Sequence, residues 1–135
     1  MKNYSLRDDI IPATKDLISL YEDVGWNSYT ENPSLLKKSL NNSLKVWTIW
    51  DEKNLIGLGR VVGDNYSIIY IQDLLILKAY QGQGLGSKLL GQILKSYEDV
   101  RQIVLLTDNN DTSVNFYEKN GLKEVSSLGS LAFMK

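Results

Sequence analysis

The 135-residue sequence contains neither cysteine nor histidine. Their absence excludes zinc sites built from these ligands, catalytic cysteines and Ser-His-Asp triads. Acid–base chemistry in this chain therefore has to use carboxylates, tyrosine, lysine, backbone groups or water. No metal cofactor is expected.

The sequence also lacks an excess of charge and lacks long apolar runs. The sequence has fifteen Lys and Arg residues and sixteen Asp and Glu residues, which gives a net charge of -1. A nucleic acid partner requires a basic surface, so no such partner is expected. No run approaches the roughly 18 apolar residues of a membrane span, and residues 1–9 lack an apolar signal core. We therefore expect a cytoplasmic protein without a membrane partner.

Hydrophobic residues make up 43% of the chain, enough to bury a core without disulfides or metals. Residue periodicity predicts one domain over residues 1–135, with a mixed α/β sheet flanked by about four helices. The expected order is a short strand, two helices, three strands, a helix, a strand, a helix and two strands. Asn32-Pro33 is predicted to start the second helix, as a cap residue followed by proline at the first helical position. The expected strands lie around Tyr4 and Leu6 and at residues 44–50, 55–62, 66–77, 103–106, 122–125 and 131–134.

A glycine-rich segment, Gln81-Gly82-Gln83-Gly84-Leu85-Gly86, separates the long apolar strand at 66–77 from an amphipathic helix. The start of a helix has backbone N–H groups without helical partners and carries the positive end of the helix dipole. Glycines allow such a backbone to approach an anion closely. The segment therefore predicts an anion site at the start of the helix.

Two nucleotide-binding motifs do not fit this segment. A P-loop needs a Gly-Lys pair after four intervening residues, but Ser87, Leu89 or the pair Gly91-Gln92 stands there. A dinucleotide fingerprint needs a third glycine where Ser87 or Leu89 stands, and a different order of strands. A nucleotide-binding regulator remains an alternative, and it predicts stabilisation by ATP or NAD.

The pattern Gln/Arg-x-x-Gly-x-Gly/Ala does fit, at Gln81, Gly84 and Gly86. With it, the sequence resembles the GNAT superfamily of N-acetyltransferases over nearly its whole length. A second motif, with Asn110 followed by residues 115–122 (Asn-Phe-Tyr-Glu-Lys-Asn-Gly-Leu), is similar to the later motif of that family. Lys78 stands where proline is common and Leu122 where phenylalanine is common.

The resemblance implies direct transfer of an acetyl group from acetyl-CoA to a primary amine of a small molecule or peptide. It implies that backbone groups bind the pyrophosphate and the pantetheine arm of coenzyme A, with one strand amide polarising the thioester carbonyl. Asn110 either contacts the pantetheine arm or caps a helix. The implied cofactor-binding residues are Leu74, Leu75, Ile76, Gln81, Gly82, Gln83, Gly84, Leu85, Gly86, Ser87, Asn110 and Tyr117.

Tyr117 is the sharpest catalytic candidate, because the family often uses a tyrosine at this position to protonate the departing sulfur. The attacking amine has a pKa of about 10 and must lose a proton before it reacts. Asp73 is a candidate for the base that accepts this proton, with Glu22 and Asp23 as alternatives. The other interpretation of Asp73, which the sequence slightly favours, is a structural carboxylate bonded to neighbouring backbone.

The connection between the first two helices often lines the acceptor pocket in this family. Glu22, Trp26 and Tyr29 are therefore the predicted substrate-binding residues, suited to a cationic or aryl-alkyl amine. The sequence does not identify the amine, and it leaves quaternary structure open, with a homodimer among the options. A non-catalytic acyl-CoA sensor on the same fold is the alternative function.

Overall fold

The computed structural model describes residues 3–135, which divide into two compact units, one ending at Leu105 and the other formed by Leu106–Lys135. That these units act as one domain stays a prediction. Within the described residues, no helix is long and apolar enough to cross a membrane. The elements of the first unit are β1 (Ser5–Arg7), α1 (Thr14–Asp23), α2 (Asn27–Thr30), α3 (Pro33–Asn41), β2 (Lys45–Asp51), β3 (Asn54–Gly63), β4 (Ile68–Ile76), the 3-10 turn η1 (Lys78–Tyr80), α4 (Leu85–Ser96) and β5 (Gln102–Leu105). The second unit contains α5 (Asp111–Lys119) and the 3-10 turn η2 (Val125–Leu128).

The five strands of the first unit form one sheet in chain order, β1-β2-β3-β4-β5. The pairs from β1 to β4 are antiparallel, and β4 pairs with β5 in parallel. A parallel neighbour requires a crossover connection, and α4 supplies it. The predicted mixed α/β sheet is thereby confirmed. About four helices were expected. The sequence interpretation missed α2, a single helical turn inside the connection between α1 and α3.

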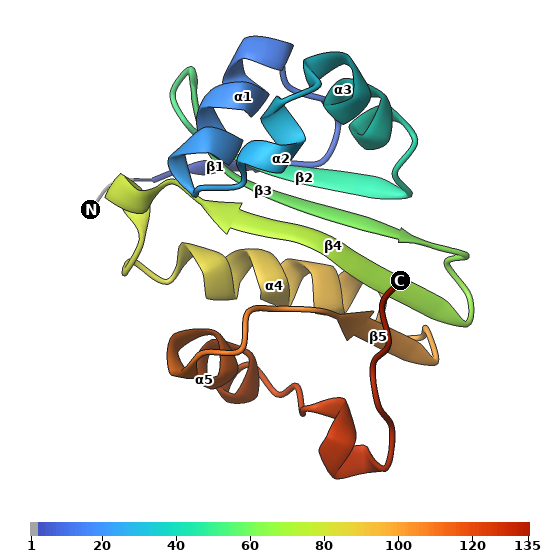
Figure 1. Cartoon of the computed structure of the whole chain (residues 1–135). Coiled ribbons are helices and arrows are strands. Elements are labelled where there is room, and N and C mark those ends of the chain that lie inside the picture. Colours follow the sequence, from blue (N-terminus) through green and yellow to red (C-terminus); the bar gives the residue numbers. More distant parts are fainter. Residues whose placement is uncertain (1–2) are drawn as a thin grey trace. The chain divides into compact units, whose positions relative to one another are not determined.

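The sheet of the first unit is covered on both faces (Figure 1). Helices α1, α2 and α3 lie on one side and α4 on the other. On the α4 side, Leu89 and Ile93 are fully buried and approach Gly59 of β3 closely. On the other side the buried core residues are Leu17, Leu20, Tyr21, Leu36, Leu40, Val46, Leu55, Leu58 and Leu75.

Helix boundaries follow the capping residues that the sequence indicates. Asn32 caps α3, where its side chain accepts a hydrogen bond from the amide of Leu35 and Pro33 occupies the first helical position. Asn110 caps α5 in the same way by accepting from the amide of Ser113 at 2.8 Å. The predicted starts of these two helices are confirmed.

The two closing strands predicted at residues 122–125 and 131–134 are wrong. Residues Val125–Leu128 form the turn η2, and no strand follows it in the described chain. The Ser127 hydroxyl donates to the Glu124 carbonyl at 2.7 Å, and such local bonds compete with strand pairing. Phe133 is 92% exposed, so the apolar pattern of the last segment buries nothing in its own unit.

Candidate active site

The glycine-rich segment leads from the end of β4 through η1 into α4. The Gln81 side chain donates to the Ile76 carbonyl at 2.9 Å and thereby ties the loop to the strand. Gly82 and Gly84 have φ angles of +83° and +81°, which residues with a Cβ rarely adopt. No described neighbouring atom lies within 4 Å of a Cβ added at either position, so the backbone angle is what requires glycine there.

Helix α4 begins without a capping side chain. Its cap residue is Gly84, and the first helical hydrogen bond runs from the Lys88 amide to the Gly84 carbonyl at 3.0 Å. The loop residues 81–84 are exposed, whereas Leu85 is buried. The helix start therefore presents first-turn backbone and the positive dipole end beside an open loop, an arrangement that suits a phosphate group.

Strand β4 extends beyond its neighbour β5. The two strands pair over Ile68–Ile71 and Gln102–Leu105, so residues 72–76 have no partner in β5. The Leu77 amide donates to the Ile56 carbonyl of β3 at 2.8 Å. Because backbone groups alternate in direction along a strand, Leu74 and Ile76 direct theirs to the opposite edge. This open edge can pair with the amide groups of an extended ligand.

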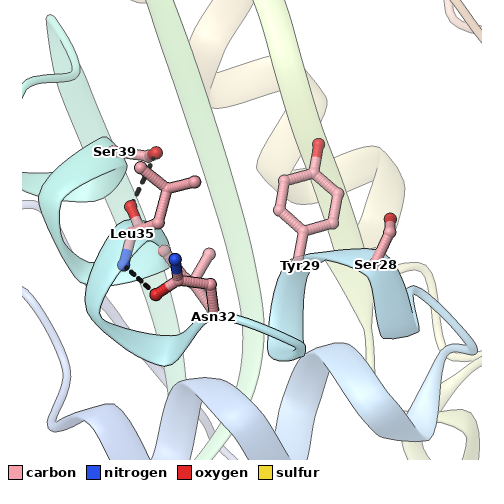
Figure 2. Close-up of a pocket in the computed structure, with 6 residues that line it drawn as sticks. Ser28, Tyr29, Asn32, Leu35 and Ser39 are labelled. Carbon is pink, nitrogen blue, oxygen red and sulfur yellow. Dashed lines mark hydrogen bonds between the residues drawn. The ribbon is translucent and has the colours of Figure 1, made fainter.

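A pocket of about 220 Å³ lies between α2 and α3 (Figure 2). Tyr29 contributes one wall from α2, and Leu35 contributes another from α3. Among residues 3–135, the Tyr29 phenol is the one ionisable side chain in its lining. The lining residues are Ser28, Tyr29, Asn32, Leu35, Leu36 and Ser39.

Of the three predicted acceptor-binding residues, the structure places one in this pocket. Tyr29 lines it, whereas Trp26 packs its ring against Tyr21 and Tyr29 at centroid distances of 6.1 and 6.0 Å. Glu22 lies on α1 with an exposed side chain and does not line the pocket. The predicted connection is therefore beside a pocket, but most of the lining comes from residues that the sequence did not indicate.

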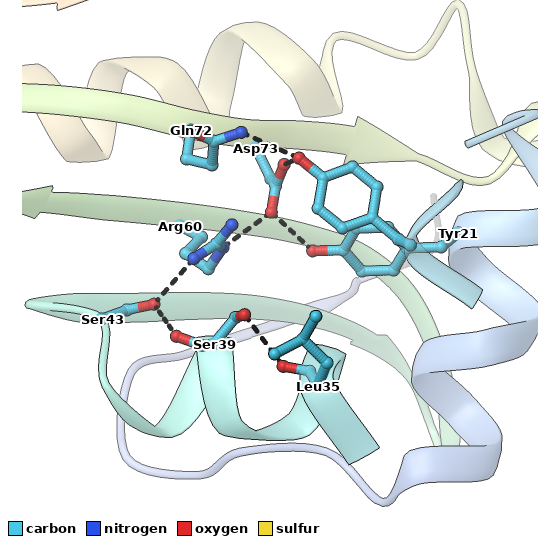
Figure 3. Close-up of polar contacts among 8 residues, drawn as sticks. Tyr21, Leu35, Ser39, Ser43, Arg60, Gln72 and Asp73 are labelled. Carbon is cyan, nitrogen blue, oxygen red and sulfur yellow. Dashed lines mark hydrogen bonds and ion pairs between the residues drawn. The ribbon is translucent and has the colours of Figure 1, made fainter. Parts of the chain in front are cut away.

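Asp73 of β4 is the centre of a buried polar network (Figure 3). Its side chain is fully buried and accepts from the Tyr21 hydroxyl at 2.8 Å and from Arg60 Nε at 2.7 Å, both on Oδ2. Its Oδ1 accepts from the Tyr29 hydroxyl at 3.0 Å. Arg60 also donates to the Ser43 hydroxyl at 3.3 Å. The Asp73 carboxylate is thus an ion-paired group with donors on both oxygens.

The network keeps its members in defined charge states. Burial and the neighbouring Asp73 carboxylate raise the pKa of the Tyr21 and Tyr29 hydroxyls, so both phenols stay neutral donors at neutral pH. Burial lowers the pKa of the Arg60 guanidinium while the Asp73 charge raises it, and the net change is a rise. The network therefore contains one positive and one negative charge, held together inside the protein.

The three carboxylates considered as the base lie in different surroundings. Asp73 would have to accept a proton while paired with Arg60, which would leave a buried cation without compensation. The Asp23 carboxylate accepts the Lys78 backbone amide at 2.7 Å and so caps η1. Glu22 is exposed to solvent. The geometry favours a structural role for Asp73, with side chains as its partners in place of the neighbouring backbone that the sequence interpretation expected.

The second unit contains Asn110 and Tyr117, which both lie on α5. Asn110 is the helix cap, so its side-chain oxygen is engaged with Ser113. Tyr117 is half-buried, and its ring meets Phe116 edge to face at a centroid distance of 5.0 Å. Burial raises the pKa of the Tyr117 hydroxyl, which also hydrogen-bonds the Thr107 side chain. Tyr117 therefore carries a proton at neutral pH and can donate it in a hydrogen bond.

Arg60 is the functional residue that the sequence interpretation missed, and the sequence did contain a signal for it. Arg60 and Asp73 are single charges inside two otherwise apolar strands that the sequence predicts as neighbours. Opposite charges in adjacent buried strands favour an ion pair, and the structure places the two residues directly opposite each other. Ser28, Asn32 and Ser39 gave no comparable signal, because polar residues on short helices are usually solvated.

Comparisons with known proteins agree with this geometry. A family model described as "Acetyltransferase (GNAT) domain" matches residues 18–131. A relative from Gracilaria tenuistipitata var. liui, named "Uncharacterized N-acetyltransferase ycf52", is 36% identical over 113 residues. The match covers 78% of this chain and 59% of the relative, so the chain spans about three fifths of the length of that relative.

Solved structures show the same fold. A GNAT family acetyltransferase from Streptococcus pneumoniae TIGR4 has a TM-score of 0.87 and 29% identity, with 98% of this chain and 97% of that chain covered. A GNAT family acetyltransferase from Elizabethkingia anophelis, crystallised with acetyl-CoA bound, has a TM-score of 0.67 and 20% identity, with 91% and 78% covered. The family model spans most of the sequence, including the glycine loop and the open edge of β4, and the chain therefore belongs to the GNAT family of acetyltransferases.

Proposed function

We propose that this protein transfers an acetyl group from acetyl-CoA to a primary amine of a small molecule or peptide. The observation that carries the proposal is the exposed glycine loop at the start of α4, which follows the open edge of β4 within the first unit. A pyrophosphate suits the loop, and the amide groups of a pantetheine arm suit the strand edge. Family membership and the acetyl-CoA bound to the Elizabethkingia protein support this cosubstrate.

The backbone supplies most of the proposed binding groups. Amides between Gln81 and Ser87 would hold the pyrophosphate, because the open space at the glycines permits close approach. The backbone groups of Leu74 and the amide of Ile76 face the open edge and would bind the pantetheine arm, with one amide donating to the thioester carbonyl oxygen as charge develops there. The Ile76 carbonyl already accepts from Gln81, and the backbone groups of Leu75 face β3. Coenzyme A supplies the acetyl group as a thioester. Asn110 is a further candidate contact to the arm.

The reaction forms a C–N bond and breaks a C–S bond; the proton lost by the amine passes to water, and the sulfur of coenzyme A leaves as a thiolate. Tyr117 is the proposed donor to the sulfur, and its raised pKa keeps the hydroxyl protonated until then. A thiol has a pKa of about 8.5, so a tyrosine above 10 acts chiefly as a hydrogen-bond donor to the departing thiolate. Without cysteine, no acetyl-cysteine intermediate can form, which supports direct transfer from acetyl-CoA to the amine.

A screen of binding and turnover separates this function from its alternatives. Acetyl-CoA is expected to raise the Tm of the protein, whereas ATP and NAD should leave it unchanged. Thiol release from acetyl-CoA should exceed background when a pool of primary amines is added. Stabilisation by acetyl-CoA without thiol release for any amine identifies an acyl-CoA sensor, and stabilisation by ATP or NAD alone identifies a nucleotide-binding regulator.

Tyr117→Phe is expected to lower kcat about tenfold to a hundredfold, near the lower limit of general-acid effects, because the raised pKa makes full proton transfer unfavourable. The loss of the bond to Thr107 should cost about 1 kcal/mol of stability. Steady-state kinetics at saturating acetyl-CoA measures kcat, and thermal unfolding confirms that the variant is folded.

Tyr66→Phe is the matched control, since Tyr66 is 81% exposed and undergoes the same chemical change. Its kcat should equal that of the wild type. A Tyr117→Phe enzyme that turns over at the wild-type rate, with the chemical step shown to be rate-limiting, rules out a role for the Tyr117 hydroxyl as donor to the departing sulfur.

A further inference from the structure

We propose that the pocket between α2 and α3 receives a compact, uncharged group of the acceptor amine. The preferred acceptors are then monoamines with one branched alkyl or aryl group, and polyamines or aminoglycosides are poor acceptors. This inference rests on the proposed acetyltransferase function. It names the class of amine, which the sequence left open between cationic and aryl-alkyl acceptors.

The size of the pocket limits what it can hold. Its volume is about 220 Å³. Cavities of about 150 Å³ accommodate benzene, whereas pockets for whole drug-sized ligands measure about 300–1,000 Å³. The pocket therefore accommodates a single ring or a branched alkyl group, and a multi-ring aminoglycoside could place only one of its rings there.

Among the described residues, the lining of the pocket contains no carboxylate that could pair with a cation. Leu35, Leu36 and the Tyr29 ring supply apolar surface, and Ser28, Asn32 and Ser39 supply hydroxyl or amide groups. A charged group that loses its water without a partner is strongly disfavoured. An alkyl or aryl group would therefore be stabilised against this lining, whereas an ammonium group would find no carboxylate partner here.

The carboxylates closest to this region in the sequence do not supply that compensation. Asp23 is engaged with the Lys78 amide, and Asp73 is engaged with Arg60 and two tyrosines. Glu22 and Glu31 are exposed and lie outside the lining. Glu22, the acidic residue among the predicted substrate-binding residues, is thus outside the pocket, and so are the other three carboxylates.

The buried ion pair fixes both walls of the pocket. The Tyr29 hydroxyl donates to Asp73 and accepts from the Gln72 side chain at 2.8 Å. Asp73 is paired with Arg60, Arg60 bonds Ser43, and the Ser43 hydroxyl donates to the Ser39 carbonyl at 2.8 Å (Figure 3). Because these bonds hold both walls in place, the pocket does not rearrange around a larger group and selects acceptors by shape.

The same contacts connect the pocket to the reacting edge of the sheet. Tyr29 bonds two consecutive residues of β4, Gln72 and Asp73, and the next residue is Leu74. Leu74 begins the backbone segment proposed to bind the pantetheine arm. An acceptor whose side group occupies the pocket is therefore held beside the strand at which the thioester is expected.

The first test compares kcat/KM for isoamylamine and phenethylamine with kcat/KM for spermidine and kanamycin, at saturating acetyl-CoA. The two monoamines are expected to be preferred at least tenfold. A preference for spermidine or kanamycin overturns the inference and leaves the acetyltransferase function standing. An absence of thiol release with all four amines and with the wider pool overturns both.

The second test places a carboxylate in the pocket. Ser28→Asp adds a negative charge to the lining at an exposed position of α2 and should shift the ratio of kcat/KM values toward spermidine by about tenfold, equal to about 1.4 kcal/mol. Ser34→Asp is the matched control, because Ser34 is an exposed residue of α3 outside the lining. An equal ratio in the two variants overturns the assignment of the pocket.

Discussion

Replacing Arg60 with methionine is expected to lower the free energy of unfolding by about 3 to 5 kcal/mol, because removal of one member of a buried ion pair leaves the other charge uncompensated. Asp73 is fully buried, and the Arg60 side chain is 8% exposed, with 2.7 Å between Nε and Oδ2. Methionine keeps an unbranched apolar side chain, so lost packing contributes little. Urea denaturation followed by tryptophan fluorescence measures the change.

Arg101→Met is the matched control for this prediction. Arg101 is exposed, so the same substitution there should change stability by no more than about 0.5 kcal/mol. Exposure is what separates the two cases: Arg7 and Asp9 also form an ion pair at 2.8 Å, but their side chains are 47% and 60% exposed. Such surface pairs contribute about 0 to 1 kcal/mol. An Arg60→Met protein as stable as Arg101→Met would contradict the buried role.

A double substitution separates the charge effect from the hydrogen bonds. Arg60→Met with Asp73→Leu removes both charges, so it should destabilise less than the sum of the two single changes. Recovery should be incomplete, because the Tyr21 and Tyr29 hydroxyls then lose their acceptor. If the double-mutant cycle gives no coupling energy between Arg60 and Asp73, the two residues act independently and the ion pair does not contribute to stability.

Those elements with strong local signals were predictable from the sequence. Asn32-Pro33 and Asn110 marked helix starts, because an asparagine side chain can satisfy a first-turn amide. The continuous apolar pattern at residues 66–77 marked β4 within two residues of its ends. The glycine segment marked the turn into α4, since two left-handed residues are needed there.

The pocket and the buried pair depended on information that local patterns do not contain. The register of β3 and β4 shifts between Arg60 and Val61, and this irregularity sets which side chains face each other. A one-residue difference would place Arg60 on the other face of the sheet. The lining of the pocket depends on the packing of α2, a four-residue helix too short for a periodic pattern.

At the C-terminal segment the sequence prediction was wrong for a different reason: a local β-like pattern was present, but no tertiary packing supports it. Leu131, Phe133 and Met134 form a β-like pattern and are 73%, 92% and 80% exposed. Strand propensity chiefly expresses packing on a half-buried pleated surface. Two four-residue strands also form at best a marginal hairpin by themselves. The polar residues that precede this segment form local hydrogen bonds, and the chain therefore adopts the turn η2 in place of a strand.

Replacing both Gly82 and Gly84 with alanine is expected to lower the free energy of unfolding by about 2 to 4 kcal/mol, since a Cβ in the left-handed region costs about 1 to 2 kcal/mol per residue. The φ angles of +83° and +81° place both residues there. The same Cβ atoms would stand where a pyrophosphate approaches the backbone, so the affinity for acetyl-CoA should fall at least about tenfold. Urea denaturation and isothermal titration with acetyl-CoA measure the two effects.

Gly91→Ala provides the matched control in the same helix. Gly91 lies inside α4, is exposed and has open space around an added Cβ, without a positive φ. Alanine there should stabilise the protein by about 0.5 to 1 kcal/mol and leave acetyl-CoA binding unchanged. The same substitution thus has opposite signs at the start and in the middle of one helix. If the double variant loses stability and still binds acetyl-CoA with wild-type affinity, the glycines serve the turn alone and the pyrophosphate lies elsewhere.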